Sequence, residues 1–247
     1  MSGPMTVVRD TWLIFRHNVR ISLRQKAGIV FGVLQPLLYL ALFGPLFATI
    51  GTWEILVPGL LLQVALFSAG MAGFGIVFDA RSGVLERLRV TPAHRVALLL
   101  GRVLGTSVTL LIQSVVLVAA GYAFGLRAPV PGALAGLVLM ILLGIGLAAL
   151  SNAIALTMNP DAFAPVMGTA MVPLLLLSGA FLPMSMAPGW LDALSRVTPF
   201  RHVLEALREL FAGRYATGTV AAGVAVALAL AVACVAVGTR VFNRENA

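Results

Sequence analysis

The sequence has few charged residues. Only 11% of its 247 residues are Asp, Glu, Lys or Arg, and 60% are hydrophobic, whereas soluble domains carry about 25% charged residues. A soluble fold of this size cannot bury so much apolar surface, so the composition predicts that a lipid bilayer is part of the solvent. Lysine is nearly absent, because Lys26 is the only lysine among the 17 Lys and Arg residues. Little lysine beside much Ala, Val, Gly and Arg is typical of a high-GC bacterial genome.

Cysteine and histidine are also scarce. The single cysteine, Cys234, excludes an internal disulfide bond and a cysteine-rich metal site. The three histidines, His17, His94 and His202, lack the spacing of zinc ligands. The serines of the apolar segments have no evident general base at a similar depth, which disfavours a membrane hydrolase. We therefore expect no catalytic residue and no metal bound by this chain.

The phosphate-binding loop of many ATPases is missing as well. That loop has the pattern G-x-x-x-x-G-K-[ST], but Lys26 is followed by Ala27, so the chain is not expected to hydrolyse ATP by that route. Carboxylates are missing from the centres of the apolar segments, because Glu54, Asp79 and Asp161 stand at their ends. Ion-coupled carriers normally keep such groups within the membrane. Backbone carbonyls also bind Na⁺, however, so a carrier stays open as an alternative.

What the sequence does contain is a series of long uncharged segments. Each is long enough for one helix of about 20 residues to cross about 30 Å of hydrocarbon. The segments are 27–53, 55–78, 103–126, 128–160, 162–191 and 215–239. They predict an all-α membrane protein with six transmembrane helices in a single domain, 1–247. An even number of crossings places both termini on the same side.

The basic residues indicate which side that is. In the six-helix topology, twelve of them lie on the side of the termini: Arg9, Arg16, Arg20, Arg24, Lys26, Arg81, Arg87, Arg89, Arg95, Arg102, Arg240 and Arg244. Five lie on the other side: Arg127, Arg196, Arg201, Arg208 and Arg214. Cytoplasmic segments carry the excess of Arg and Lys. We therefore expect a multi-pass plasma-membrane protein with cytoplasmic termini, and no nucleic acid as partner.

Two segments outside the predicted crossings are amphipathic. Residues 1–26 predict an interfacial helix, with arginines beside an apolar face that includes Trp12 and Phe15. Residues 184–214 predict a pair of external helices that lie at the outer leaflet or dip back into it. Pro199 separates the two helices, because the residue before a proline avoids helical angles.

The spacing of charges within the second external helix predicts two ion pairs. Arg201 and Glu205 are four residues apart, and Glu205 and Arg208 are three apart, and both spacings bring side chains together on one helix face.

The stretch "FDARSGVLERLRVTPAHRV" (78–96) interrupts the apolar sequence with basic, helix-like residues that end at a proline. Residues 79–95 form the expected cytoplasmic loop between the second and third crossings. Such a loop fits a contact with a soluble partner that supplies the missing source of energy. Arginines that only set the orientation of the chain are the simpler alternative.

Two motifs resemble a known family. The stretch "SGVLERLRVTPAHRVALLLGR" (82–102) resembles the loop after the second helix of ABC-2 type export permeases, in which Glu, Leu and Thr-Pro precede Gly-Arg. The stretch "LSGAFLPMSMAPGWLDALSRVTPFRHVLEALREL" (177–210) resembles the family signature, in which "SG-aromatic-x-P" leads through "PGW" to a proline and an arginine nine residues later. The two motifs stand in the family's order. Within the family, the sequence looks most similar to drug-resistance and nodulation-factor exporters.

The resemblance implies a permease subunit that is not itself an enzyme. Two permease subunits would pair as a homodimer or heterodimer in the bilayer. Two copies of a separate cytoplasmic ABC ATPase would bind beneath them, and the cofactors ATP and Mg would be bound by that partner.

The resemblance also implies three functional segments. A coupling helix would dock on the ATPase through Val84, Leu85, Glu86, Arg87, Leu88, Arg89, Thr91 and Pro92. A second cytoplasmic contact would use Asn159, Pro160 and Asp161. An outer gate would contain Ser178, Gly179, Phe181 and Pro183. Arg102, near the start of the third crossing, is expected to matter less for coupling.

The function expected from these observations is export of a hydrophobic or amphipathic compound, such as a drug, an antibiotic or a lipid-like product. The main alternative is a secondary carrier or channel that works without an ATPase. A membrane enzyme and a non-transporting sensor or scaffold are further alternatives.

Overall fold

The computed structural model describes residues 4–24, 26–48, 53–83, 95–181, 184 and 187–245, and this part of the chain is helical without any strand. The helices are α1 (Pro4–Arg24), α2 (Lys26–Ala48), α3 (Trp53–Gly70), α4 (Phe74–Arg81), α6 (Arg95–Phe124), α7 (Val130–Thr157), α8 (Pro160–Leu177), α9 (Gly189–Val197), α10 (Pro199–Phe211) and α11 (Gly218–Glu245).

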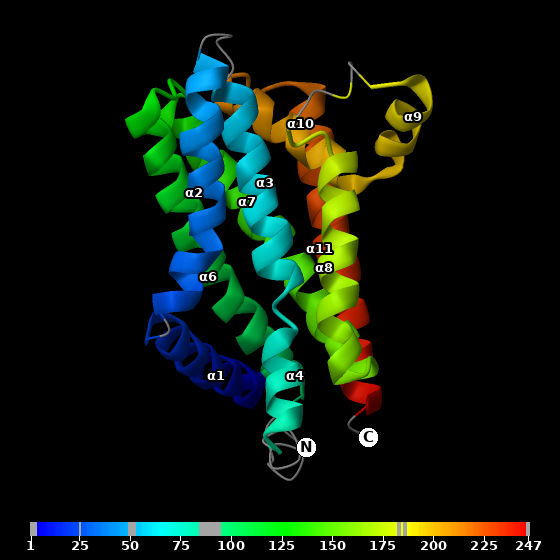
Figure 1. The fold of residues 1–247 in the computed structure, drawn as a ribbon. Helices are drawn as coiled ribbons and strands as arrows, with labels where there is room; N and C mark the ends of the chain where they lie inside the picture. Colours follow the sequence, from blue (N-terminus) through cyan, green and yellow to red (C-terminus); the bar gives the residue numbers. More distant parts are fainter. Residues whose placement is uncertain are drawn as a thin grey trace.

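The long helices run side by side and form a bundle (Figure 1). Five helical stretches are long and apolar enough to cross a membrane: Trp53–Arg81, Val96–Phe124, Val130–Thr157, Pro160–Leu177 and Gly218–Arg244. The helix α2 lies along them and contains a shorter apolar stretch, Val30–Pro45. The prediction of an all-α membrane protein is therefore confirmed, with five to six apolar helices.

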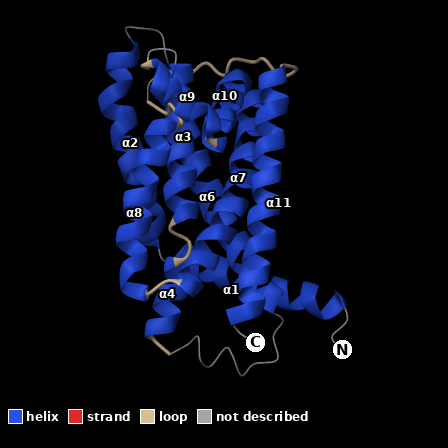
Figure 2. Ribbon diagram, turned by 90° about the vertical axis from the view of Figure 1, so that its right-hand side faces the viewer, coloured by secondary structure: helices blue, strands red, loops and turns tan. Residues whose placement is uncertain are grey.

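The bundle has two distinct ends. The helices α1 and α4 and the last turns of α11 lie at one end, which we call the termini end (Figures 1 and 2). The helices α9 and α10 lie at the opposite end, which we call the far end. The long helices run alternately between these ends, as the prediction of an even number of crossings requires.

The helix α3 occupies the centre of the bundle. It contacts α2, α6, α7, α8 and α10, and Leu60, Leu61 and Leu66 are fully buried. Peripheral helices instead carry exposed apolar side chains, such as Phe31 and Leu42 of α2. Apolar residues on both the inside and the outside of a bundle are expected where the surrounding medium is lipid.

Small residues allow the helices to approach closely. A methyl group on Gly146 of α7 would lie 2.9 Å from the Cα of Ala231 in α11. The contact of α1 with α6 is similar, since a methyl group on Gly101 would lie 2.5 Å from Cγ2 of Ile14. Glycine and alanine at helix contacts are typical of membrane bundles, where association depends on close packing.

The amphipathic segments fold as helices close to the expected bounds. The helix α1 covers most of predicted segment 1–26 and lies across the termini end (Figure 2). Its side chain Trp12 is 61% exposed, whereas Ile14 lies close to Gly101 of α6. At the far end, α9 and α10 form the predicted pair, and Pro199 is the first residue of α10, where its missing N–H has no helical partner to lose.

Candidate functional site

The second predicted crossing is broken rather than continuous. Sequence analysis placed one helix over 55–78, but the structure ends α3 at Gly70 and begins α4 at Phe74. Phe74 N–H donates to the carbonyl of Met71 at 3.0 Å, so the regular bond to the carbonyl of Gly70 is not made. The helix α4 then continues to Arg81, which makes the start of the predicted 79–95 loop helical.

A buried hydroxyl group of α7 forms hydrogen bonds with the backbone groups that this break leaves without helical partners. Ser151 Oγ donates to the carbonyl of Gly70 at 2.5 Å and accepts from the N–H of Gly73 at 2.9 Å. Both backbone groups would otherwise lack partners inside the bundle, where an unsatisfied polar group costs several kcal/mol. We call this break between α3 and α4 the joint. It is stabilised by the side chain of Ser151, which lies 78 residues after Gly73 in the sequence.

The joint requires a close approach that only glycine allows. A methyl group on Gly73 would lie 2.7 Å from Cζ of Phe163 and 2.8 Å from Cβ of Ala155. The ring of Phe163 also makes an edge contact with Phe74, with 5.3 Å between the ring centroids. The start of α4 is thus packed against both α7 and α8.

Two ion pairs hold the other end of α4. Asp79 pairs with Arg102 of α6, and both side chains are largely buried. Arg81 pairs with Asp161 of α8, and both side chains are largely exposed. The short helix α4 is therefore connected to α6, α7 and α8 at the termini end of the bundle. Because Arg102 bonds to α4, it is a poor neutral control for the loop that follows this helix.

The structure brings two predicted segments together here. Asn159 Oδ1 accepts from the N–H of Asp161 at 3.0 Å and caps the start of α8, with Pro160 as its first residue. Asp161 then reaches Arg81, directly before the predicted coupling helix. The predicted coupling residues Val84, Leu85, Glu86, Arg87, Leu88, Arg89, Thr91 and Pro92 lie outside the described residues.

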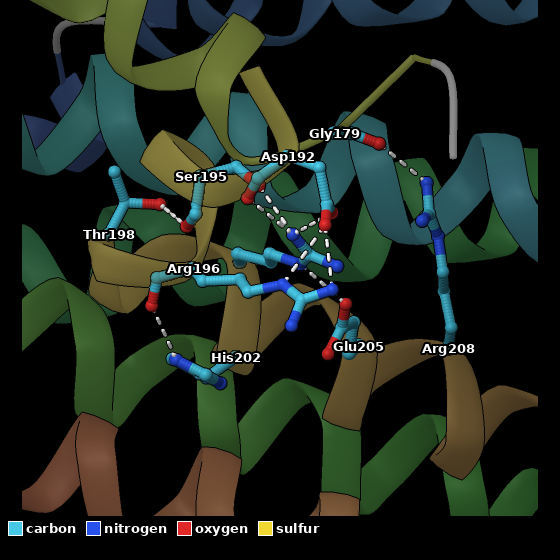
Figure 3. Close-up of polar contacts among 9 residues, drawn as sticks. Gly179, Asp192, Ser195, Arg196, Thr198, His202, Glu205 and Arg208 are labelled. Carbon is cyan, nitrogen blue, oxygen red and sulfur yellow. Dashed lines mark hydrogen bonds and ion pairs between the residues drawn. The ribbon is translucent and has the colours of Figure 1, made fainter. Parts of the chain in front are cut away.

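The far end contains a polar network centred on Arg201, whose partners Asp192, Ser195 and Glu205 are labelled in Figure 3. Arg201 Nη1 donates to Asp192 Oδ1 at 2.5 Å and to Ser195 Oγ at 2.5 Å, and Arg201 Nε donates to Glu205 Oε1 at 2.8 Å. The Arg201–Glu205 pair confirms the spacing argument. One arginine of α10 thereby joins three side chains and connects α10 to α9.

Further bonds close the connection between α9 and α10. Thr198 Oγ1 donates to the carbonyl of Ser195 at 2.7 Å, and the ring Nε2 of His202 lies 3.0 Å from the carbonyl of Arg196 (Figure 3). The hydrogen bonds from Arg201 hold the pKa of Asp192 below its usual range, as expected for a carboxylate beside guanidinium groups. The two helices therefore form one polar-bonded unit.

Arg208 behaves differently from Arg201. It was expected to pair with Glu205, but its Nη2 instead donates to the carbonyl of Gly179 at 2.8 Å and, at 3.4 Å, to that of Ala180 (Figure 3). Its buried Nε has no hydrogen-bond partner among the described residues. Burial lowers the pKa of Arg208 to about 10, which still leaves the group charged at neutral pH.

The turn that Arg208 contacts contains the predicted gate residues. Ser178 Oγ donates back to the carbonyl of Leu175 at 2.6 Å, and Gly179 adopts a φ of 78°, which favours glycine. The ring of Phe181 makes an edge contact with Tyr39 of α2 at 6.0 Å between centroids. Pro183 lies outside the described residues. The contact of Arg208 with this turn was missed by sequence reasoning, which assigned that arginine to its own helix.

The polar residues buried inside the bundle are uncharged. Across the described ranges, the buried polar side chains are Gln63, Ser107, Gln113, Ser114, Ser151, Asn152, Ser178 and Ser195. The described part of the chain also has no group of three or more His, Cys, Asp or Glu residues that would suit a metal ion. Hydrogen bonding rather than charge is therefore what the interior offers.

Comparisons with known proteins agree with one another. Residues 9–212 match the family described as ABC-2 type transporter. A putative transport permease, ycf38, of Cyanophora paradoxa is 28% identical over 200 residues, which cover 76% of this chain and 69% of that protein. The daunorubicin resistance ABC transporter permease protein DrrB1 of Streptomyces coeruleorubidus is 28% identical over 193 residues, with coverage of 73% and 67%. The probable doxorubicin resistance ABC transporter permease protein DrrC of Mycobacterium tuberculosis is 24% identical over 156 residues, with coverage of 62% and 56%.

Proposed function

Because this chain belongs to the ABC-2 type transporter family, with drug-resistance permeases among its relatives, we propose that it exports hydrophobic or amphipathic compounds and is driven by separate ATPase subunits. The chain is the membrane subunit of such a system and contains the apolar helices that this role needs. The observation that carries the proposal is the family match over residues 9–212 of a helical bundle.

The cargo class follows from the relatives and from the interior of the bundle. Two relatives are named for resistance to daunorubicin or doxorubicin, which are amphipathic drugs. The buried polar residues of the described chain are amides and hydroxyls. Apolar ligands with a few polar groups suit an interior of this kind.

We propose that the termini end faces the cytoplasm. Twelve of the 17 Arg and Lys residues belong to segments of that end in the six-helix topology, in the sense of the positive-inside rule. Reporter fusions after Ala247 and before Gly189 should then report opposite sides of the membrane. Reports from the same side would contradict this topology.

In this orientation α4 would carry the motion of the ATPase into the bundle. The helix leads directly to the proposed coupling helix at 84–92, and it is tied to α6, α7 and α8 by Arg102, Ser151 and Asp161. The proposed second contact, Asn159 to Asp161, lies beside it. A docked ATPase would thus act on one connected group of helices.

At the other end, the turn of Ser178, Gly179, Phe181 and Pro183 would form the outer gate. The unit of α9 and α10 would cap the exit on the outer side. A second permease subunit would complete the pathway, and each subunit would bind one ATPase that holds ATP and Mg.

The test is transport by the reconstituted complex. The chain is co-expressed with a candidate ABC ATPase subunit, and inverted vesicles are assayed for ATP-dependent accumulation of doxorubicin. Accumulation that requires both the ATPase and ATP supports the proposal. Accumulation that persists without them would instead establish a carrier or channel.

Variants in the coupling helix sharpen this test. Glu86→Ala and Arg87→Glu should weaken co-purification of the ATPase, since removal of an anchor residue often costs about 2 kcal/mol or more. Arg127→Ala is a matched control, because this exposed residue lies in the loop between α6 and α7 at the far end. If these variants bind the ATPase and support ATP hydrolysis like the parent, the stretch only determines the orientation of the chain in the membrane.

A further inference from the structure

Arg208 is unusual among the charged residues of the far end. Arg201, Arg196 and Arg214 each form an ion pair with a carboxylate. Arg208 forms none with any described residue and directs its hydrogen bonds to the carbonyls of Gly179 and Ala180. These carbonyls follow the end of α8, where helix carbonyls lack intrahelical partners and a positive charge is favourable.

The contact joins α10 to the turn that follows α8. The helix α10 is firmly packed, since a methyl group on Gly136 of α7 would lie 2.7 Å from Cδ1 of Leu207 and 2.8 Å from Cε2 of Phe211. The helix α8, which leads into the turn, is the least buried of the five apolar stretches. The helix before the turn is thus less enclosed by its neighbours than α10 is.

The turn is also pressed against the central helix. Any side chain on Gly59 of α3 would overlap the carbonyl group of Ala180. The carbonyls of the turn thus lie between α3 on one side and Arg208 on the other.

We propose that Arg208 is a positioning residue of the outer gate, which keeps the Ser178–Phe181 turn closed against α3 by binding the carbonyls of Gly179 and Ala180. Release of these two carbonyls opens the turn. This inference rests on the proposed function in assigning the turn to the gate. It also explains the sequence signature, because the "SG" turn and the arginine nine residues after Pro199 are the two partners of one contact.

The geometry suits hydrogen bonds between Arg208 and the turn that can form and break. A charged donor makes strong bonds to carbonyls, which favours the closed turn. The bonds use Nη2 alone, and the buried Nε of Arg208 has no partner among the described residues. The hydrogen-bonding capacity of the guanidinium group is therefore not fully used in the closed state. Opening of the turn breaks only two hydrogen bonds of Arg208.

The first experiment measures closure without an ATPase. Cys234 is replaced by Ala to remove the only cysteine, and the buried Ser178 is replaced by Cys as a nearly isosteric probe. Right-side-out vesicles are treated with a membrane-impermeant maleimide. Arg208→Gln should speed labelling of this Ser178→Cys probe by about tenfold or more, since two charge-assisted bonds are lost. Arg208→Lys, which still donates to a carbonyl, should give an intermediate rate.

A second probe separates local opening from general loosening. Ala128, which is buried in the loop before α7 at the same end, is replaced by Cys, since the hydrogen bonds of Arg208 go to Gly179 and Ala180 instead. Labelling at this position should be the same in the parent and in Arg208→Gln. Equal labelling of the Ser178→Cys probe in the two backgrounds would overturn the inference, as would an equal rise at both probes.

A third measurement separates this inference from the proposed function. The complex with the ATPase is trapped with ATP and vanadate, and labelling of the Ser178→Cys probe is measured in the parent and in Arg208→Gln. Faster labelling in the trapped parent supports the gate. A probe that responds to Arg208→Gln but not to trapping supports the hold on the turn and overturns its assignment as a gate.

Discussion

The two ends of the bundle are held together in different ways. At the termini end, α4 is tied to three other helices by contacts between residues far apart in the sequence: Ser151 with Gly70 and Gly73, Arg102 with Asp79, and Arg81 with Asp161. At the far end, most polar contacts join α9 to α10, which are neighbours in the sequence (Figure 3).

The difference teaches how each end responds to force. At the termini end, the polar contacts of α4 and of the break before it cross to α6, α7 and α8, so we expect a displacement of α4 to be passed to these helices. The α9–α10 unit of the far end keeps its own shape, and among its side-chain bonds those of Arg208 reach the turn after α8. This difference fits our proposal that the first end distributes a motion and the second releases one.

The largest effect is expected at the joint. Ser151→Ala removes one hydroxyl and leaves the Gly70 carbonyl and the Gly73 N–H without partners. Each orphaned buried group costs about 1–3 kcal/mol, so the free energy of unfolding should fall by about 2–6 kcal/mol for the two groups. Reversible unfolding in detergent measures it.

Ser107→Ala is the matched control for this variant. Ser107 is also buried in a long helix, but its hydroxyl donates to the carbonyl of Val103 within α6, so its loss should cost under about 1 kcal/mol. Equal losses for the two serines would show that the joint is not held as described.

The central arginine of the far end should have the next largest effect. Arg201→Met removes the bonds from α10 to Asp192 and Ser195 of α9, and it leaves Asp192 with Arg196 alone. Because Arg201 is only 14% exposed, the free energy of unfolding should fall by about 1–2 kcal/mol. Arg196→Met, at a side chain that is 70% exposed, is the control and should change it little.

The same network predicts a dependence on pH. The bond from Arg201 lowers the pKa of Asp192, so the carboxylate stabilises the fold at neutral pH. This contribution is lost only as the pH falls through the lowered pKa, below the usual range for Asp. In Arg201→Met the acid transition should shift to higher pH; an unchanged transition would contradict the assignment.

The partly buried Asp79–Arg102 ion pair should have a small effect on the free energy of unfolding and a clearer effect on the coupling of ATP hydrolysis to transport. Asp79→Asn keeps the shape of the side chain and weakens the bond to Arg102, with an expected loss of about 1 kcal/mol. Drug-stimulated ATP hydrolysis by the complex should fall more clearly, because α4 then moves without α6. Normal stimulation in this variant would argue against a role of α4 in coupling.

The smallest effect is expected for Arg81 and Asp161. These side chains are 58% and 84% exposed, and exposed pairs contribute about 0–1 kcal/mol. A double-mutant cycle with Arg81→Ala and Asp161→Ala should give a small coupling energy that vanishes at high salt, because salt screens exposed charges. A large coupling energy that does not depend on salt would show that this pair stabilises the fold as strongly as the Ser151 contacts do.

Sequence reasoning was accurate where the signal is local. The uncharged segments located the helices that cross the bundle, and Pro199 located the boundary between α9 and α10. The spacing of Arg201 and Glu205 predicted their ion pair. These features depend on residues within one helix or turn, so they can be predicted from residues that are close together in the sequence.

The failures concern contacts between distant segments. The break between α3 and α4 contains no proline, while Pro58 and Pro165 stand inside unbroken helices. Its signal is two glycines three residues apart, which are too common in membrane helices to be diagnostic. Arg208 was assigned to Glu205 for its spacing, but the Gly179 carbonyl, 29 residues earlier, is its partner.

The sequence by itself determined the membrane class, the number of long apolar segments, the amphipathic helices and the family. Hydrophobicity, charge and helical period act along the chain, so composition and order suffice to read them. Only the tertiary structure decided that Ser151 repairs the helix break, that α4 is tied to α6 and α8, and that Arg208 contacts the turn after α8. Each of these depends on which unsatisfied backbone group or charge meets a given side chain when the helices pack. That choice is made by the geometry of the bundle, because a buried polar group must find a partner wherever the packing places one.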